Sequence, residues 1–271
     1  MGKDGCELTQ WSDLYGRAVF ARHPEGFPVF LSPAELEVPD EYRDSDPYGV
    51  EQSLDGPFQT RRIACTLELL GTAVRRLSSP RILDLGCGPG HITQRIHQGF
   101  PKADLFGLDY SVSAIRYAVH HFPGIDFVAA NAYDAPYFPG YFDVVLCNNL
   151  WEHIPDPLRL LGHIVVVMKP DGYLVLSTPS RYRLGNLLRV LCGKTVELAS
   201  EHHVTEYTVG QVYEQLRYRG FRVLRSMSRP DPRIRTWSKA GIVQAIFSQF
   251  IRWSHSHHQL EATVFYLAQH T

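Results

Sequence analysis

The sequence predicts an α/β protein built on a doubly wound, mostly parallel sheet, and three observations support this prediction. Apolar strand-like runs alternate five times with amphipathic helix-like runs, as in consecutive βαβ units. The first run, residues 82–85, leads directly into Gly86, Gly88 and Gly90, where the backbone can reach positive φ. Asp109 ends the second run about 20 residues later, where a doubly wound fold presents a carboxylate to ribose hydroxyls.

Length, charge and cysteine content limit the classes of protein that this chain can be. A chain of 271 residues suits one large α/β domain or two small ones. The formal net charge of −1 argues against a whole-protein electrostatic attraction to nucleic acid, although a local basic patch is compatible with it. The five cysteines form no C-x-x-C pair, which favours reduced thiols in a cytoplasmic protein. No apolar run reaches the roughly 18 residues of a membrane span, and the N-terminus lacks a signal-peptide core, so we expect no transmembrane segment.

Residues 1–57 are expected to form an N-terminal cap on a catalytic domain that spans residues 58–271. Prolines interrupt any long helix in the cap, yet the segment is too apolar for a disordered tail. Its large apolar side chains are Trp11, Tyr15, Phe20, Phe27, Phe30 and Leu31. The cap could contact the substrate or simply cover the core.

The catalytic domain is expected to begin with an amphipathic helix over residues 58–77 and to continue through seven strands. Apolar side chains recur at helical spacing in this helix, at Phe58, Ile63, Leu67, Leu70 and Val74. The strands are expected at residues 82–85, 104–109, 125–130, 142–147, 173–177, 221–228 and 261–268.

Helices are expected to connect these strands. Ser111 can cap the helix that follows the second strand. A helix over residues 158–168 and the turn Pro170-Asp171-Gly172 precede the fifth strand. Thr208 opens a later helix that Gly220 closes.

Two insertions, at about residues 180–200 and 231–258, depart from the minimal fold. The first places Arg181, Arg183, Arg189 and Lys194 among leucines and valines, so it could cover the substrate pocket or lie on a membrane surface. Residues 235–253 form a helix too apolar for a narrow stripe, and we expect it to be buried against the cap, a second subunit or a lipid-like substrate. Peripheral membrane contact and a homodimer are both compatible with this pattern.

The glycine spacing and a neighbouring acid indicate the charge of the ligand. A dinucleotide fingerprint reads G-x-G-x-x-G, whereas here the third glycine comes one residue early. Asp84 stands just before the loop, where its carboxylate would repel a phosphate and attract an ammonium group. The sequence therefore favours a ligand that is cationic near the loop.

Four ordered segments resemble the class I S-adenosylmethionine (SAM)-dependent methyltransferases. They are LDLGCGPGHIT, LFGLDYSVSAI, FVAANAYDAPYFPGYFDVVLCNN and VVVMKPDGYLVLSTP, within residues 82–179. The resemblance implies a Rossmann-like sheet with the last strand antiparallel between the fifth and sixth. It also implies SAM as cofactor and S-adenosyl-L-homocysteine (SAH) as product. EHHVTEYTVGQVYEQLRYRGF (201–221), with RYRLGNLLRVLCGK (181–194), resembles small-molecule methyltransferases of the ubiquinone-biosynthesis-like and the glycan or secondary-metabolite type.

The resemblance also implies which residues bind the cofactor. Asn131 stands where these enzymes usually carry an acid for the adenine amino group; its carbonyl oxygen can still accept that hydrogen bond. On the first helix, Arg62 or Gln59 could reach the SAM carboxylate, although Arg61 and Arg62 also suit a solvated face. The expected cofactor-binding residues are Asp84, Gly86, Cys87, Gly88, Gly90, His91, Asp109, Tyr110, Asn131, Ala132, Asn148 and Arg62.

Methyl transfer from a sulfonium makes modest chemical demands on the protein. The displacement is in line and its leaving group departs neutral, so the protein mainly aligns the reactants. A hydroxyl acceptor must lose its proton when it attacks the methyl group, so a general base would assist the reaction. His153 and His203 are the candidates for this catalytic role, although a histidine in a helix or loop is more often structural.

A divalent metal is a further hypothesis, which we do not favour. Some similar methyltransferases hold a metal with an E-x-x-E-H run and a distant histidine, and the candidate ligands here are Glu152, His153 and His203. The first carboxylate of that run is replaced by Asn149, which weakens a site for a hard cation. We therefore expect no metal.

The sequence leaves alternatives open for the acceptor and for the reaction class. We expect O-methylation of a small molecule such as a secondary metabolite, glycan or quinone, and no nucleic-acid substrate. One alternative is a SAM-binding module without catalysis. The other is an NAD-dependent oxidoreductase, which would need the other glycine spacing and a hydride-site pair such as Tyr-x-x-x-Lys, and neither is found.

Overall fold

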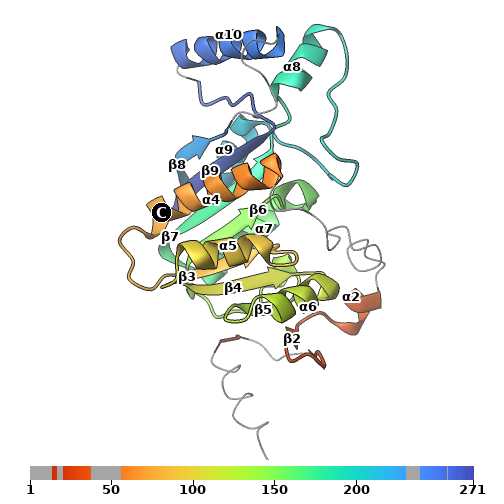
Figure 1. Ribbon diagram of the computed structural model, residues 1–271, viewed down its shortest axis with the longest axis vertical. Helices are drawn as coiled ribbons and strands as arrows, with labels where there is room; N and C mark the ends of the chain where they lie inside the picture. The colour runs from red at the N-terminus through yellow and green to blue at the C-terminus, as the bar shows by residue number, and fades with distance from the viewer. Residues whose placement is uncertain (1–13, 17–20, 38–55, 230–238, 255) are drawn as a thin grey trace, which may run out of the picture. The chain divides into compact units, whose positions relative to one another are not determined.

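The structure is a computed structural model that describes residues 14–16, 21–37, 56–229, 239–254 and 256–271 (Figure 1). The chain divides into two compact units. Unit 1 comprises Met1–Ser53, Val74–Leu146 and Arg159–Tyr173, and unit 2 comprises Leu54–Ala73, Cys147–Leu158 and Leu174–Thr271. The two expected domains, residues 1–57 and 58–271, are a different division and stay a prediction.

The core of unit 1 is a set of parallel strands whose side chains are nearly all buried. It contains β3 (Arg81–Leu85), β4 (Asp104–Asp109), β5 (Asp126–Ala129) and most of β6 (Phe142–Asn148). The register places Asp84 of β3 opposite both Gly107 of β4 and Leu146 of β6. The carboxyl ends of these strands therefore lie side by side, which is where open parallel sheets bind ligands.

Two helices of unit 1 pack on this sheet, and each begins at a residue that the sequence indicated. Helix α5 (His91–Gly99) starts after Gly90, and α6 (Val112–His121) starts after Ser111, whose Oγ accepts a hydrogen bond from the Ala114 N–H. Both helices contact β4, and α6 also contacts β5 (Figure 1). The expected cap at Ser111 is confirmed.

The described part of the N-terminal segment joins the sheet, which corrects the expected strand number from seven to nine. Strands β1 (Ala21–Arg22) and β2 (Pro28–Val29) form an antiparallel pair, and Val29 pairs in parallel with Ala129 of β5. The run around β2 is buried: Phe27, Val29, Phe30 and Leu31. These side chains bury apolar surface while β2 pairs with an otherwise open strand edge. Helix α2 (Pro33–Glu37) follows; Trp11 and Phe20 lie outside the described residues.

Unit 2 contains the antiparallel pair β8 (Phe221–Met227) and β9 (Thr263–His270). Helix α4 (Pro57–Val74) opens this unit, and α8 (Leu184–Leu191) lies in the first predicted insertion. Helix α9 (Val209–Tyr218) packs on β8 and starts with a capping box formed by Thr208 and Gln211. Gly220, at φ 78°, follows α9 as expected.

The strand order confirms the doubly wound α/β class. It reads β1-β2-β5-β4-β3-β6-β7-β9-β8, with the antiparallel β9 between β7 and β8 as predicted. Helix α7 (Pro157–Val167) leads into β7 (Met168–Pro179). The expected turn at Pro170-Asp171-Gly172 lies inside β7, which corrects that prediction. Asp171 takes φ 59° there, and the missing Cβ of Gly172 leaves room for Met168, whose Cγ would lie 2.3 Å from it.

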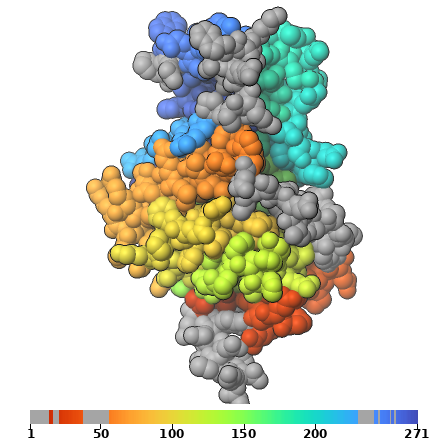
Figure 2. Space-filling model, in the orientation of Figure 1, coloured from red at the N-terminus to blue at the C-terminus, as the bar shows by residue number. Residues whose placement is uncertain are grey.

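The described residues do not cover the apolar side chains of helix α10 (Lys239–Trp253), so the expected burial against the cap, a second subunit or a lipid-like substrate stays a prediction. Ile242, Ile246, Phe250 and Trp253 recur along the helix and are exposed, Trp253 to 76%. Atoms of α10 and α8 lie at the surface of unit 2 (Figure 2). Trp237 lies outside the described residues, and no helix among the described residues is long and apolar enough to cross a membrane.

Gly107→Ala should destabilise the protein by about 1–3 kcal/mol, the usual cost of overpacking a core. A Cβ at Gly107 would lie 2.4 Å from Phe127 Cδ1 and 3.0 Å from Cys87 Sγ. Gly185→Ala in α8 is the matched control, since its Cβ would meet no described atom within 4 Å and Ala is the better helix former. Thermal unfolding should shift down for the first variant only. Equal melting temperatures of Gly107→Ala and the unsubstituted protein would show that this contact is not tight.

Candidate functional site

The glycine loop between β3 and α5 has the backbone conformation that the sequence predicted. Gly86, Gly88 and Gly90 have φ angles of 77°, 54° and 79°. The Gly86 and Cys87 N–H groups donate to the Leu108 carbonyl at 2.8 and 3.1 Å, which ties the loop to β4. The next N–H, that of Gly88, donates to Asp109 Oδ2 at 2.7 Å. The loop and the acid at the end of β4 thus form one hydrogen-bonded structure.

Gly90 has a packing role that the sequence did not indicate. A Cβ there would lie 2.9 Å from Phe127 Cζ and 3.0 Å from Ala118 Cβ. Contacts below 3.0 Å are not tolerated without movement of the neighbour. Gly90 therefore lets the start of α5 approach β5 and α6, whatever it does for a ligand.

The side chains of Asp84, Cys87 and His91 are engaged with protein. Asp84 is buried, and its Oδ2 accepts a hydrogen bond from Thr93 Oγ1 at 2.7 Å, which fastens the first turn of α5 to the end of β3. Burial raises the pKa of the Cys87 thiol well above its usual value, so the thiol stays protonated. The His91 ring packs against Tyr117, and burial lowers the pKa of its imidazole. Because these three side chains already contact protein, the main chain of the glycine loop is better suited to bind a ligand.

At the end of β5, Asn131 contacts a residue that the sequence reasoning missed. Asn131 Oδ1 accepts from the Tyr133 N–H, and Asn131 Nδ2 donates to Glu35 Oε1, both at 3.0 Å. The Tyr110 hydroxyl donates to the Glu35 carbonyl at 3.0 Å. The S-x-x-E spacing of Ser32 and Glu35 is a capping-box signal that could have located α2. No sequence signal shows that α2 lies against β5, because that contact spans 96 residues.

The end of β6, in unit 2, carries a buried amide whose hydrogen-bonding capacity is only partly used. Asn148 Oδ1 accepts from Ser177 Oγ at 3.1 Å, and the Asn148 carbonyl accepts from Arg62 Nη2 at 2.8 Å. Asn148 Nδ2 and Gln59 Oε1 are buried and have no hydrogen-bond partner among the described residues. Asn149 takes φ 53°, a strained conformation for a non-glycine residue. Unpaired buried polar atoms beside a strained residue are typical of a ligand site.

Glu152, His153 and His203, also in unit 2, come together although 49 residues separate the two histidine segments in sequence. One ligand atom of each lies within 4.8 Å of the others. The buried Glu152 carboxylate accepts from Asn149 Nδ2 at 3.0 Å and from Thr178 Oγ1 at 3.2 Å. The two predicted catalytic histidines therefore do share one site.

The partners of the two histidines determine which ring nitrogen carries the proton. His203 Nδ1 lies 2.9 Å from Glu206 Oε1, and His153 Nδ1 lies 3.1 Å from the His202 carbonyl. A carboxylate and a carbonyl can only accept, so each Nδ1 must be the donor. In the neutral rings Nε2 then carries the lone pair, which is the form that a base or a metal ligand requires.

Glu206 is the second residue that the sequence reasoning missed. Its side chain is fully buried and forms an ion pair with Arg183, and its Oε1 also accepts from the Ala199 N–H. This carboxylate holds the His203 ring in place through its contact with Nδ1. Glu206 lies three positions after His203, but that spacing alone does not distinguish a contact from two solvated side chains.

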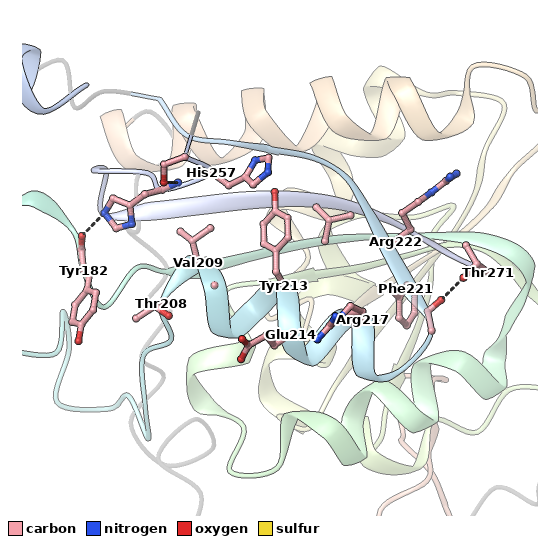
Figure 3. Close-up of a pocket in the computed structure, with 15 residues that line it drawn as sticks. Tyr182, Thr208, Val209, Tyr213, Glu214, Arg217, Phe221, Arg222, His257 and Thr271 are labelled. Carbon is pink, nitrogen blue, oxygen red and sulfur yellow. Dashed lines mark hydrogen bonds between the residues drawn. The ribbon is translucent and has the colours of Figure 1, made fainter. Parts of the chain in front are cut away.

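A cavity of about 930 Å³ lies elsewhere in unit 2, along α9 and the start of β8. Tyr213 points from α9 toward His257, and Arg217 and Arg222 lie at its other end (Figure 3). The Tyr213 and His257 rings are stacked, with centroids 5.4 Å apart. None of the site residues expected from the sequence lines this cavity.

Comparison with known proteins identifies a family. A family model described as a methyltransferase domain matches residues 77–225. Over 100 residues the chain is 35% identical to trans-aconitate 2-methyltransferase of Rhodopseudomonas palustris (strain BisB18), a match that covers 36% of this chain and 38% of that protein. Over 120 residues it is 32% identical to ubiquinone biosynthesis O-methyltransferase of Thiobacillus denitrificans, covering 42% and 51%. The chain thus spans about half or less of these relatives.

Solved structures show the same fold at low identity. The plantazolicin methyltransferase BpumL, in complex with a pentazolic desmethylPZN analog and SAH, aligns with a TM-score of 0.56 and 17% identity, covering 88% of this chain and 93% of that one. The [4+2]-cyclase SpnF aligns with a TM-score of 0.57 and 17% identity, covering 81% and 85%. Identity this low shows a shared fold and no more.

Proposed function

This chain belongs to the methyltransferase-domain family, and from that premise we propose that it transfers the methyl group of SAM to a small-molecule acceptor. The family match over residues 77–225 carries this proposal, because it includes both the glycine loop and Asp109. The hydrogen bond from Gly88 to Asp109 supports it from the structure. The SpnF fold likeness is a reason to test the reaction directly, since one fold can serve different chemistry.

The residues of unit 1 fit SAM. SAM supplies a methyl group on a positively charged sulfur. In unit 1, we propose that the main chain of residues 86–90 binds the methionine part and that Asp109 accepts hydrogen bonds from the ribose. In unit 2, Asn148 Nδ2 and Gln59 Oε1 are buried without a hydrogen-bond partner among the described residues, and Asn148 and Arg62 stay predicted contacts. Ala132 and His91 stay predicted contacts.

We propose that the acceptor is a hydroxyl and that His203 removes its proton. Its Nδ1 is held by the buried Glu206, which leaves Nε2 as the basic atom and stabilises the ring once it is charged. His153 lies beside it, with ring centroids 5.1 Å apart, and is the second candidate. Some of the similar proteins are O-methyltransferases by name, which agrees with this proposal.

The same cluster could hold a metal, and the donor set limits which one. Two imidazoles and one carboxylate suit Zn²⁺ better than Mg²⁺, which prefers oxygen ligands. Both oxygens of Glu152 already accept hydrogen bonds from Asn149 and Thr178. We therefore keep the proton-transfer role as the proposal and treat metal binding as its competitor.

Asp109→Ala should weaken SAM binding by about 10- to 100-fold, the effect of losing a charged hydrogen bond and the anchor of Gly88. Asp104→Ala, at the exposed start of the same strand, is the control and should leave the affinity unchanged. Titration calorimetry with SAM measures both. No heat of binding with the unsubstituted protein would contradict the proposed function.

Turnover distinguishes an enzyme from a binding module that retains the SAM pocket. When the protein is mixed with SAM and a panel of phenols, carboxylic acids and sugars, SAH should form in the presence of at least one of these acceptors. SAM binding without turnover on any class would favour the binding module. A cytoplasmic location, a homodimer and a small-molecule partner without nucleic acid stay predictions.

A further inference from the structure

Glu35 brings a carboxylate to the carboxyl end of the sheet in unit 1. It lies in α2, outside the segment matched by the family model, yet its Oε1 accepts a hydrogen bond from Asn131 at the end of β5. Its carbonyl accepts a second one from the Tyr110 hydroxyl, just after β4. Glu35 thus contacts the two residues that follow neighbouring strands on the ligand-binding edge.

The orientation of the Glu35 carboxylate is held by its own helix. Glu35 Oε2 accepts from the Ser32 N–H and from Ser32 Oγ, both at 2.8 Å, and the Glu35 N–H donates back to Ser32 Oγ at 3.3 Å. One oxygen is therefore committed to the capping box, and the other faces Asn131. The side chain is placed before any ligand arrives.

Asn131 is poorly suited to act as the main acceptor at this edge. Its carbonyl oxygen already accepts from the Tyr133 N–H and caps the short helix that follows β5. Its amide nitrogen is a donor and points at Glu35. Glu35 therefore brings a carboxylate to the end of β5, and a charged acceptor binds a donor about twice as strongly as a neutral one.

We propose that the Glu35 carboxylate accepts a hydrogen bond from the 6-amino group of the cofactor's adenine, an assignment that rests on the proposed function. With the ribose at Asp109, on β4, the base extends toward the next strand outward, which is β5. A 6-amino group donates, whereas a 6-oxo purine would present an oxygen to the Glu35 carboxylate. The N-terminal segment therefore selects an adenine nucleoside.

A double-mutant cycle between protein and ligand tests this assignment. Calorimetry compares SAH with its analogue that carries hydrogen in place of the 6-amino group, for the unsubstituted protein, Glu35→Ala and Glu35→Gln. The unsubstituted protein should prefer SAH by about 10- to 100-fold. Glu35→Ala should bring this preference below about 3-fold, and Glu35→Gln, which keeps a neutral acceptor, should fall between. Glu37→Ala, at the exposed end of the same helix, should keep the full preference.

The ratio of the two affinities separates recognition from positioning. If Glu35 only held Asn131 and Tyr110 in place, Glu35→Ala would weaken the binding of SAH and of its analogue equally. The unchanged preference for SAH would then overturn the adenine assignment but not the proposed function. Failure of the unsubstituted protein to bind SAH would overturn the proposed function and the assignment with it. Circular dichroism checks that each variant is folded.

Discussion

Gly88→Val is expected to lower the affinity for SAM by about 100-fold or more, because the loop could no longer hold its present conformation. Gly88 has φ 54°, a region in which a β-branched residue is a clear outlier and costs about 1–3 kcal/mol. Relief of that strain would turn the Gly88 N–H away from Asp109 Oδ2, which it now meets at 2.7 Å. The added methyl groups would also keep a ligand away from the main chain. Titration calorimetry with SAM measures the loss.

Gly140→Val is the matched control for Gly88→Val. Gly140 also has a positive φ, 66°, and a Cβ there would meet no described atom within 4 Å. Both variants should lose a similar amount of stability through backbone strain, measured by thermal unfolding. Only Gly88→Val should lose affinity for SAM. An unchanged affinity in a folded Gly88→Val would place the cofactor elsewhere.

His203→Ala is expected to lower kcat by about 10²- to 10⁴-fold, the range for removal of a positioned general base. The affinity for SAM should stay within about 3-fold, a change of less than roughly 1 kcal/mol, because we assign His203 to the acceptor. Activity is measured with the acceptor that the panel identifies. Added imidazole should restore part of the rate, since it can take up the proton in place of the lost ring.

His202→Ala is the control for His203→Ala, because the His202 side chain is exposed and the substitution keeps the main-chain carbonyl that faces His153 Nδ1. Its kcat should match that of the unsubstituted protein. Treatment with a chelator separates the two roles of the cluster. Rate loss on chelation that Zn²⁺ reverses would assign His203 to a metal, and full activity of His203→Ala would remove it from the mechanism.

Much of the fold followed from local pattern. The apolar runs at 82–85 and 142–147 predicted strands, and the structure places them side by side in parallel. Ser111 and Thr208 located two helix starts, because a capping hydrogen bond joins residues three apart. Such signals lie within one turn or one strand and do not depend on the rest of the chain.

The sequence was a poorer guide where the local structure depends on segments that are far apart in the chain. The pairing of Val29 with Ala129 adds β1 and β2 to the sheet, and strands of two residues are too short to be recognised from the sequence pattern. The expected turn residues at 170–172 lie within the bounds of β7, although Asp171 keeps a positive φ of 59°. For α10, hydrophobic spacing shows that one face is apolar but not which partner covers it, so its expected burial stays a prediction.

The sequence by itself determined the α/β class, the strand that feeds the glycine loop, the acid at the end of β4, and the family resemblance. These features depend on residues close together in the chain, where steric limits and side-chain spacing act directly. Only the tertiary structure brought Glu35 to Asn131 and made Glu206 the buried support of His203. Charged side chains such as these look solvated in a sequence, and they acquire a role only when folding removes water and supplies a partner.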